Sequence, residues 1–453
     1  MRIPIAGGAH SAQHRGKIRE MTCIPDSARR MVTVGATAAV LVSVMACEAG
    51  NAHVTSPRGS AALERFVVIG GDLSMGVESG GVVSSTQGAS WPAIIALEAG
   101  VTFQQPLFKS PGCSPPLVAP LILGRWLSGS STATRDSSCA GAASSVIPPA
   151  DNLALAGATA WAALNVTPKL MAAAPAAYDA LDRVRYAFVL ANPQSQVTAM
   201  LVKAPTFVAV ELGSAEIVNA ATSGLLVAAA SYTQLAPWTY IPAAVAAPVI
   251  TAISDSVLKS GAKAVMLSVP HVTRLPALRR GSEIGAQRTA LAGYGVTVSG
   301  DCDANANLVN VVRKITPLAL RALALGVAQP LSCANVPGTA DQVLTPADVA
   351  TLDAVADQIN AQLKQIAQSH GWAFVDLDPA FSSMLTPVGS YVASAHLACA
   401  VPFGWYFSLD GLRPSPEGQH VVADAVAAAI NGTYGLGLPV RGASTELRVN
   451  PCP

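Results

Sequence analysis

Charged residues are scarce in this chain, and neither sign predominates. They make up 12% of the 453 residues, and 28 Lys and Arg stand against 27 Asp and Glu, which gives a net charge of +1. No basic run is present, which argues against a nucleic-acid partner. Aromatic residues are also few, at 5%, yet 51% of the residues are hydrophobic. This composition excludes a disordered chain and predicts a sizeable buried core.

Spacings typical of metal sites are missing as well. The chain has neither a Cys-x-x-Cys pair nor a Cys/His pattern of the zinc-binding kind, so we expect no metal and no cofactor. After Cys47 no uninterrupted apolar run is long enough to cross a bilayer. The longest Ala/Val-rich stretch, residues 217–257, is interrupted by Pro237, Pro242 and Pro248.

The N-terminal residues 1–47 have the pattern of an export signal. Arg29 and Arg30 precede an uncharged apolar stretch, Met31–Ala46, that is too short for a stable membrane span. Small residues directly before Cys47 are typical of a bacterial lipobox. We therefore expect a lipoprotein of the cell envelope, anchored to a membrane through a lipid on Cys47. The alternative is an ordinary signal peptide followed by an incidental cysteine.

Six cysteines remain after the signal, an even number that suggests disulfides in an exported chain. Fifteen pairings are possible for six cysteines. Neighbours in the sequence close the shortest loops and so cost the least entropy. This favours the pairs Cys113–Cys139, Cys302–Cys333 and Cys399–Cys452.

Short apolar runs alternate with helix-like segments along the chain. Runs at 65–70, 205–213, 262–270 and 372–377 predict buried strands, and segments 90–100, 243–260, 345–371 and 416–430 predict helices. This alternation indicates an α/β fold with a parallel sheet covered by helices on both faces. We expect a tether at 48–60, one domain over 61–440 with an insertion at about 280–344, and a disulfide-held tail at 441–453.

Five segments in order along residues 65–435 resemble the SGNH/GDSL ester hydrolases, in particular large envelope lipoproteins. They are Phe66–Gly76, Asn152–Ala158, Leu212–Ile217, Val269–Thr273 and Phe407–Ser415. The resemblance implies a three-layer α/β/α, flavodoxin-like fold with a central parallel sheet of about five strands. It also implies a serine nucleophile, a histidine base with an aspartate three residues earlier, and an oxyanion hole formed with a glycine N–H and an asparagine amide.

Most of these positions hold other residue types. Asp72 stands at the nucleophile position, Ala215 at the asparagine and Arg413 at the histidine, while Gly157 and Asp410 match the family. A guanidinium cannot serve as a general base at neutral pH. We expect Arg413 to pair with Asp72 inside the former active-site cleft, with Asp410 as a second acceptor. The resemblance therefore implies a catalytically impaired protein that binds acyl or glycan ligands.

The alternative is an active carboxylic-ester hydrolase with relocated groups. Ser74 is the serine nearest to the missing nucleophile, and His271, at a predicted strand end, is the best candidate for an unorthodox base. Ser74 more simply belongs to the first turn of a helix, and His271 to a loop. We interpret His396 as a loop residue and His420 as a surface or packing residue. Asp72 as a covalent nucleophile would still lack a base to activate water.

Overall fold

The computed structural model describes residues 61–131, 135–143, 145–233, 235–442 and 452. Its central sheet has the order β1 (Phe66–Gly70), β4 (Phe207–Glu211), β7 (Lys263–Leu267) and β13 (Ala373–Val375). All neighbouring pairs are parallel. The carboxyl ends of these strands therefore meet at one edge of the sheet, where ligands gather in open α/β folds.

The strands are apolar because both faces of the sheet are covered. Side chains alternate between faces along a strand, and the structure separates them into two cores. Val67 and Ile69 of β1 belong to one core, whereas Phe66 and Val68 belong to the other. Continuous apolar runs rather than alternating ones are the pattern of such a buried parallel sheet.

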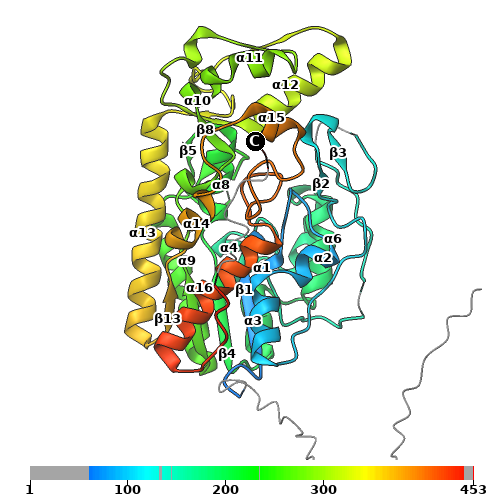
Figure 1. Ribbon diagram of the computed structural model, residues 1–453. Helices are drawn as coiled ribbons and strands as arrows, with labels where there is room; N and C mark the ends of the chain where they lie inside the picture. The colour runs from blue at the N-terminus through cyan, green and yellow to red at the C-terminus, as the bar shows by residue number, and fades with distance from the viewer. Residues whose placement is uncertain (1–60, 132–134, 144, 234, 443–451, 453) are drawn as a thin grey trace, which may run out of the picture. The chain divides into compact units, whose positions relative to one another are not determined.

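Helices form the two outer layers (Figure 1). One core includes side chains of α4 (Ala160–Asn165), α7 (Gln196–Val202), α9 (Ala243–Ser260) and α13 (Pro346–His370). The other includes side chains of α3 (Trp91–Ala99) and α16 (Pro416–Tyr434), which pack against each other. Glycines at positive φ end α9, α13 and α16, as expected for left-handed C-caps.

The predicted α/β class with three layers is confirmed. The predicted sheet of about five strands is corrected to four among the described residues. The next place is taken by the extended segment Asp151–Leu155, whose backbone pairs with Val68 and Gly70 of β1 at 2.8–3.1 Å and forms one parallel bridge at Asn152. This segment follows the sheet without becoming a regular strand.

The predicted insertion contains small sheets of its own. Strands β12 (Val343–Leu344), β10 (Leu308–Asn310) and β8 (Leu278–Arg280) form an antiparallel sheet, and β9 (Val296–Val298) pairs with β11 (Gln329–Leu331) in parallel. The helices here are α10 (Gly281–Ala286), α11 (Arg288–Ala292) and α12 (Val311–Leu325). The domain limits themselves stay predictions, and 1–60 lies outside the described residues.

The other elements are short. The helices are α1 (Asp72–Met75), α2 (Ser84–Gly88), α5 (Pro168–Ala173), α6 (Ala180–Val189), α8 (Ala215–Ser223), α14 (Asp378–Leu385) and α15 (Ala393–Ala398). The 3-10 turns are η1 (Leu121–Leu123), η2 (Pro175–Ala177), η3 (Val272–Arg274) and η4 (Gly300–Cys302). Two-residue strands pair as β2 (Leu117–Val118) with β3 (Arg125–Trp126), and as β5 (Val227–Ala228) with β6 (Thr239–Tyr240).

The three predicted disulfides are confirmed. Cys113 pairs with Cys139, Cys302 with Cys333, and Cys399 with Cys452, across sequence separations of 26, 31 and 53 residues. Each links sequence neighbours, as the loop-closure argument predicts.

One described helix, α9, has the length and apolar composition of a membrane span. It packs against α13 and α4 and contributes Ile250 and Ile253 to the core. A single such helix is weak evidence for a span, since core helices pass the same test.

Candidate functional site

The family-like segments meet at the carboxyl edge of the sheet. Asp72 follows β1, Ala215 follows β4, and Val269 follows β7. Gly157 comes from the segment along the free edge of β1, and Arg413 comes from the turn before α16. All five line one small pocket of about 70 Å³. Segments that are far apart in the sequence thus meet at one pocket.

A buried carboxylate sets the position of Asp72. Helix α1 has no side-chain cap of its own. Instead Oε2 of Glu211, at the end of β4, accepts hydrogen bonds from the backbone N–H groups of Gly71 at 3.0 Å and Ser74 at 3.1 Å. The Gly71 N–H also donates to the Glu211 backbone carbonyl at 3.1 Å, whereas the Ser74 N–H at the helix start would otherwise lack a partner. Burial raises the pKa of Glu211 to about 7, against the smaller opposing effect of the two N–H donors.

Asp410 organises the turn that carries Arg413. Its Oδ1 accepts hydrogen bonds from the Ser408 hydroxyl and the N–H groups of Leu412 and Arg413 at 2.9–3.1 Å. Its Oδ2 accepts from the Gly80 N–H at 3.0 Å. The side chain is 8% exposed. An aspartate bonded in this way to the backbone two and three residues ahead fixes a tight turn.

Arg413 joins the two carboxylates, as predicted. Its Nε donates to Oδ2 of Asp72 at 2.9 Å, and its Nη2 contacts the same oxygen. Its Nη1 donates to Oδ2 of Asp410 at 2.9 Å. Oδ1 of Asp72 accepts the remaining hydrogen bond, from the Gly157 N–H at 2.8 Å. The expected ion pair with a second acceptor is therefore confirmed.

The charges in this cluster stabilise one another. Burial by itself would raise the pKa of Asp72, but the charge and hydrogen bonds of Arg413, with the Gly157 N–H, outweigh it and lower this pKa. Burial would also lower the pKa of Arg413, but the two carboxylates reverse the effect and raise it. Both shifts favour the ionised forms of Asp72 and Arg413.

This arrangement differs from the serine–histidine pair and oxyanion hole that the family resemblance implies. Arg413 has no lone pair with which to accept a proton. The Gly157 N–H, which the family resemblance assigns to the oxyanion hole, already donates to Asp72. Ala215 lines the pocket but offers no side-chain donor. The positions are retained, while the groups that would transfer protons and stabilise an oxyanion are not.

Ser74 lies away from the pocket. Its side chain is fully buried in α1, beside Gly70, where an added Cβ would stand 2.8 Å from its Oγ. Ser74 does not line either of the two cavities next to Asp72. The alternative nucleophile is thus in the first helical turn and not presented to a ligand.

His271 is committed to carboxylates. Its Nδ1 contacts Oδ2 of Asp378, and its Nε2 lies 3.0 Å from Oδ1 of Asp357. Burial alone would lower the pKa of His271, but these two carboxylates raise it. An imidazole whose two nitrogens both contact carboxylates is not a free base. Neither nitrogen of His271 contacts Ser74, so the structure does not pair these two side chains.

His396 and His420 also lie outside the lining of the cavities next to Asp72. His396 is buried between the Thr316 hydroxyl and the Tyr391 hydroxyl, at 3.1 and 3.0 Å, so the expectation of a loop histidine is corrected to a core residue of α15. Burial lowers the pKa of His396 to about 3. His420 lies on α16, as expected, and burial lowers its pKa. Neither lines the cavities next to Asp72.

A larger cavity of about 630 Å³ lies on the other side of the Asp72–Arg413 pair. It shares Asp72, Gly157, Ala215 and Arg413 with the small pocket. Its charged lining groups are Asp72, Asp182, Asp410, Arg135, Arg185, Arg313 and Arg413. The site is therefore a small, mainly apolar pocket beside a wider cavity whose lining is both apolar and charged.

Three contributors to the site were missed by sequence reasoning: Glu211, Arg185 and Arg313. Glu211 had a usable signal, because a carboxylate that ends an otherwise apolar buried strand needs a partner. Arg185 on α6 and Arg313 on α12 had none, because helices remote in sequence bring them to the cavity.

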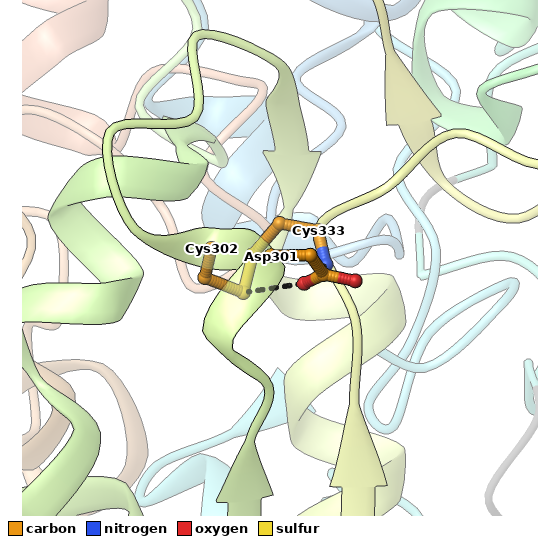
Figure 2. A group of neighbouring side chains, drawn as sticks. All are labelled: Asp301, Cys302 and Cys333. Carbon is orange, nitrogen blue, oxygen red and sulfur yellow. Dashed lines mark hydrogen bonds between the residues drawn. A yellow bond between two sulfur atoms is a disulfide. The ribbon is translucent and has the colours of Figure 1, made fainter.

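One described cluster has the composition of a metal site. Figure 2 shows Asp301, Cys302 and Cys333, with Oδ1 of Asp301 3.5 Å from Sγ of Cys302. Both sulfur atoms belong to one disulfide, so neither is a thiolate ligand. Asp301 instead accepts the Cys333 N–H at 3.0 Å and a contact from the Ser332 hydroxyl. The carboxylate fixes this loop rather than an ion.

No protein-family model matches the chain, and no curated protein matches it. Among solved structures it is similar to an extracellular lipase from Streptomyces rimosus. The two share 15% identity over 81% of this chain and 98% of the lipase, with a TM-score of 0.33. A TM-score this low supports no conclusion about fold or function, so the proposals below depend on the geometry of the chain itself.

Replacing the arginine tests the ion-pair cluster. Arg413→Met leaves Asp72 and Asp410 facing each other without a cation, and we expect a loss of about 2–3 kcal/mol in the free energy of unfolding. This is below the cost for fully buried pairs because Arg413 and Asp72 are 21% and 20% exposed. The control Asp72→Asn/Arg413→Met removes both charges and should recover part of the loss. Urea denaturation that shows unchanged stability for Arg413→Met would contradict the assigned contacts.

The buried Glu211 predicts a pH-dependent stability. Its folded pKa of about 7 lies above the ordinary 4.5, so its contribution is fully present below pH 4.5 and is lost as the pH rises through 7. Glu211→Gln keeps an acceptor for Gly71 and Ser74 but does not titrate. Relative to the wild type, the variant should gain on the order of 3 kcal/mol between pH 4.5 and pH 8. A constant difference in urea denaturation across this range would show that Glu211 ionises normally.

Proposed function

We propose that this chain is an exported protein with the scaffold of an SGNH/GDSL ester hydrolase that binds a ligand without hydrolysing it. The binding site is the pair of cavities at the carboxyl edge of the sheet. The observation that carries the proposal is the Arg413 guanidinium shared between Asp72 and Asp410. It occupies the place where the family resemblance puts a nucleophile and a base.

The arrangement of the five segments supports this scaffold. Gly157 donates its N–H toward the tip of β1, where an oxyanion donor is needed, and Asp410 contacts the side chain three residues later, where it would orient a histidine. These are the relations that hydrolysis requires. They persist here between side chains that cannot complete the reaction.

Ligand binding is favoured over a purely structural role by the cavities. A purely structural role does not account for the cavity of about 630 Å³ that adjoins the Asp72–Arg413 pair. This volume is within the range of small-molecule sites. Acyl or glycan groups are the ligand classes that the resemblance suggests.

Export as a lipoprotein is part of the proposal. Cys47 lies outside the described residues, so its support is the sequence pattern and the three disulfides, which persist in oxidising compartments. The intact mass of the protein recovered from membranes separates a lipid-modified Cys47 from an ordinary signal peptide.

Hydrolysis of short-chain nitrophenyl esters tests the proposal. We expect the wild type to show no turnover above background, and Ser74→Ala to be indistinguishable from it. Turnover that Ser74→Ala abolishes would overturn the proposal in favour of an active hydrolase.

Restoring the family's groups provides the positive arm of this test. Asp72→Ser/Ala215→Asn/Arg413→His should hydrolyse the same esters, and the form that keeps Ala215 should be roughly 10²–10³-fold slower, since it lacks one oxyanion donor. A folded triple variant without turnover would contradict the identification of this cleft as a former active site.

A further inference from the structure

The larger cavity contains more cationic than anionic side chains. Four arginines line it, Arg135, Arg185, Arg313 and Arg413, against the three carboxylates Asp72, Asp182 and Asp410. In a chain with a net charge of only +1, this gathering of arginines at one site is not a general property of the surface. Low-dielectric walls strengthen the field of charges that line a cleft.

Each of the three carboxylates is paired with one of two arginines, and these five groups together keep one negative charge. Arg413 holds Asp72 and Asp410. Arg185 lies 3.3 Å from Asp182 and also donates from Nε to the Cys113 carbonyl at 2.7 Å. These pairs account for every acidic residue that lines the cavity.

Arg313 has no such partner. Among the described residues its guanidinium forms no ion pair. The charges that act on it are those of Arg413 and Asp410, which form an ion pair with each other. The side chain is exposed in the cavity. Its backbone is fixed, because the Asn310 side chain caps the first turn of α12 through the Arg313 N–H at 3.1 Å. A positioned but unpaired guanidinium is suited to bind an oxyanion in a bidentate manner.

The rest of the cavity suits an organic body attached to that anion. Apolar side chains of the β2–β3 hairpin face those of α12, among them Leu117, Trp126, Pro317 and Leu320. The hairpin and α12 approach closely, since a Cβ on Gly124 would lie 2.9 Å from Cδ1 of Leu320. Amide groups of Asn219 and Gln342 add polar contacts.

We propose that the larger cavity binds an organic anion, a carboxylate or a phosphate ester, with its oxyanion on Arg313 and its body between the β2–β3 hairpin and α12. This inference rests on the proposed function and specifies its ligand class. A carboxylate is also what ester hydrolysis would release, so the site would hold a product-like acid rather than a neutral ester.

Calorimetric titration of the purified protein tests the inference with hexanoate, phenyl phosphate and inorganic phosphate, and with hexanamide as a neutral probe. The variant is Arg313→Gln, which removes no ion pair. The matched control is Arg321→Gln, an equal change of charge at an exposed position of the same helix. Thermal melting of each variant verifies that it is folded.

We expect at least one organic anion to bind the wild type and the Arg321→Gln variant alike. Arg313→Gln should bind it roughly 10- to 100-fold more weakly, because the variant loses a charge-assisted hydrogen bond to the anion. The affinity for hexanamide should not change. Tighter binding of hexanoate or of phenyl phosphate identifies the class of acid. Comparing phenyl phosphate with inorganic phosphate shows whether the organic part of the ligand contributes to the affinity.

Equal affinity of folded wild type and Arg313→Gln for the anions, or no binding of any anion, would overturn the inference. Binding of hexanamide alone would overturn it and leave the proposed function standing. Ester turnover by the wild type would instead remove the proposed function, whatever the anions do.

Discussion

The site depends on one guanidinium shared between two carboxylates. Arg413 binds Asp72, 341 residues away in sequence, and Asp410 within its own turn. The contact connects the end of the first strand to the segment before the last helix. It also bears on the proposed function, because an arginine between two carboxylates stays protonated and does not act as a base.

The surroundings hold this cluster in place from several directions. Glu211 accepts hydrogen bonds from the backbone of Gly71 and Ser74 at the start of α1. Gly80 and Ser408 donate hydrogen bonds to Asp410. Asn152 donates to the Ser74 carbonyl at 2.9 Å and thereby links the β1 edge segment to α1. Such contacts make the geometry stiff even though the partners are far apart in sequence.

Local patterns predicted much of the fold. Helix α9 spans the predicted residues 243–260, and α13 lies within one residue of the predicted 345–371 at both ends, because capping and glycine signals are local. The four strands were predicted because their apolar runs are continuous. The predicted number of about five strands was too high by one. The segment 151–155 pairs with β1 through its backbone but does not form a regular strand.

The residues of the site could be predicted where they belong to a family-like segment. They could not be predicted where the packing of helices determines their position. The Asp72–Arg413 contact followed from charge types at aligned positions. The burial of Ser74, the carboxylates around His271 and the arrival of Arg313 depend on how helices pack, which a single sequence does not specify. Glu211 is intermediate, because its place in a buried strand was visible although its partners were not.

Reaction with a fluorophosphonate, which phosphonylates the hydroxyl of an activated serine with loss of fluoride, tests the central claim most directly. Because no described serine contacts a histidine at the Asp72 cavities, the intact mass of the treated protein should be unchanged while a serine esterase in the same tube is fully labelled. A stoichiometric adduct that peptide mapping assigns to Ser74, or to any serine of this cleft, would contradict the account.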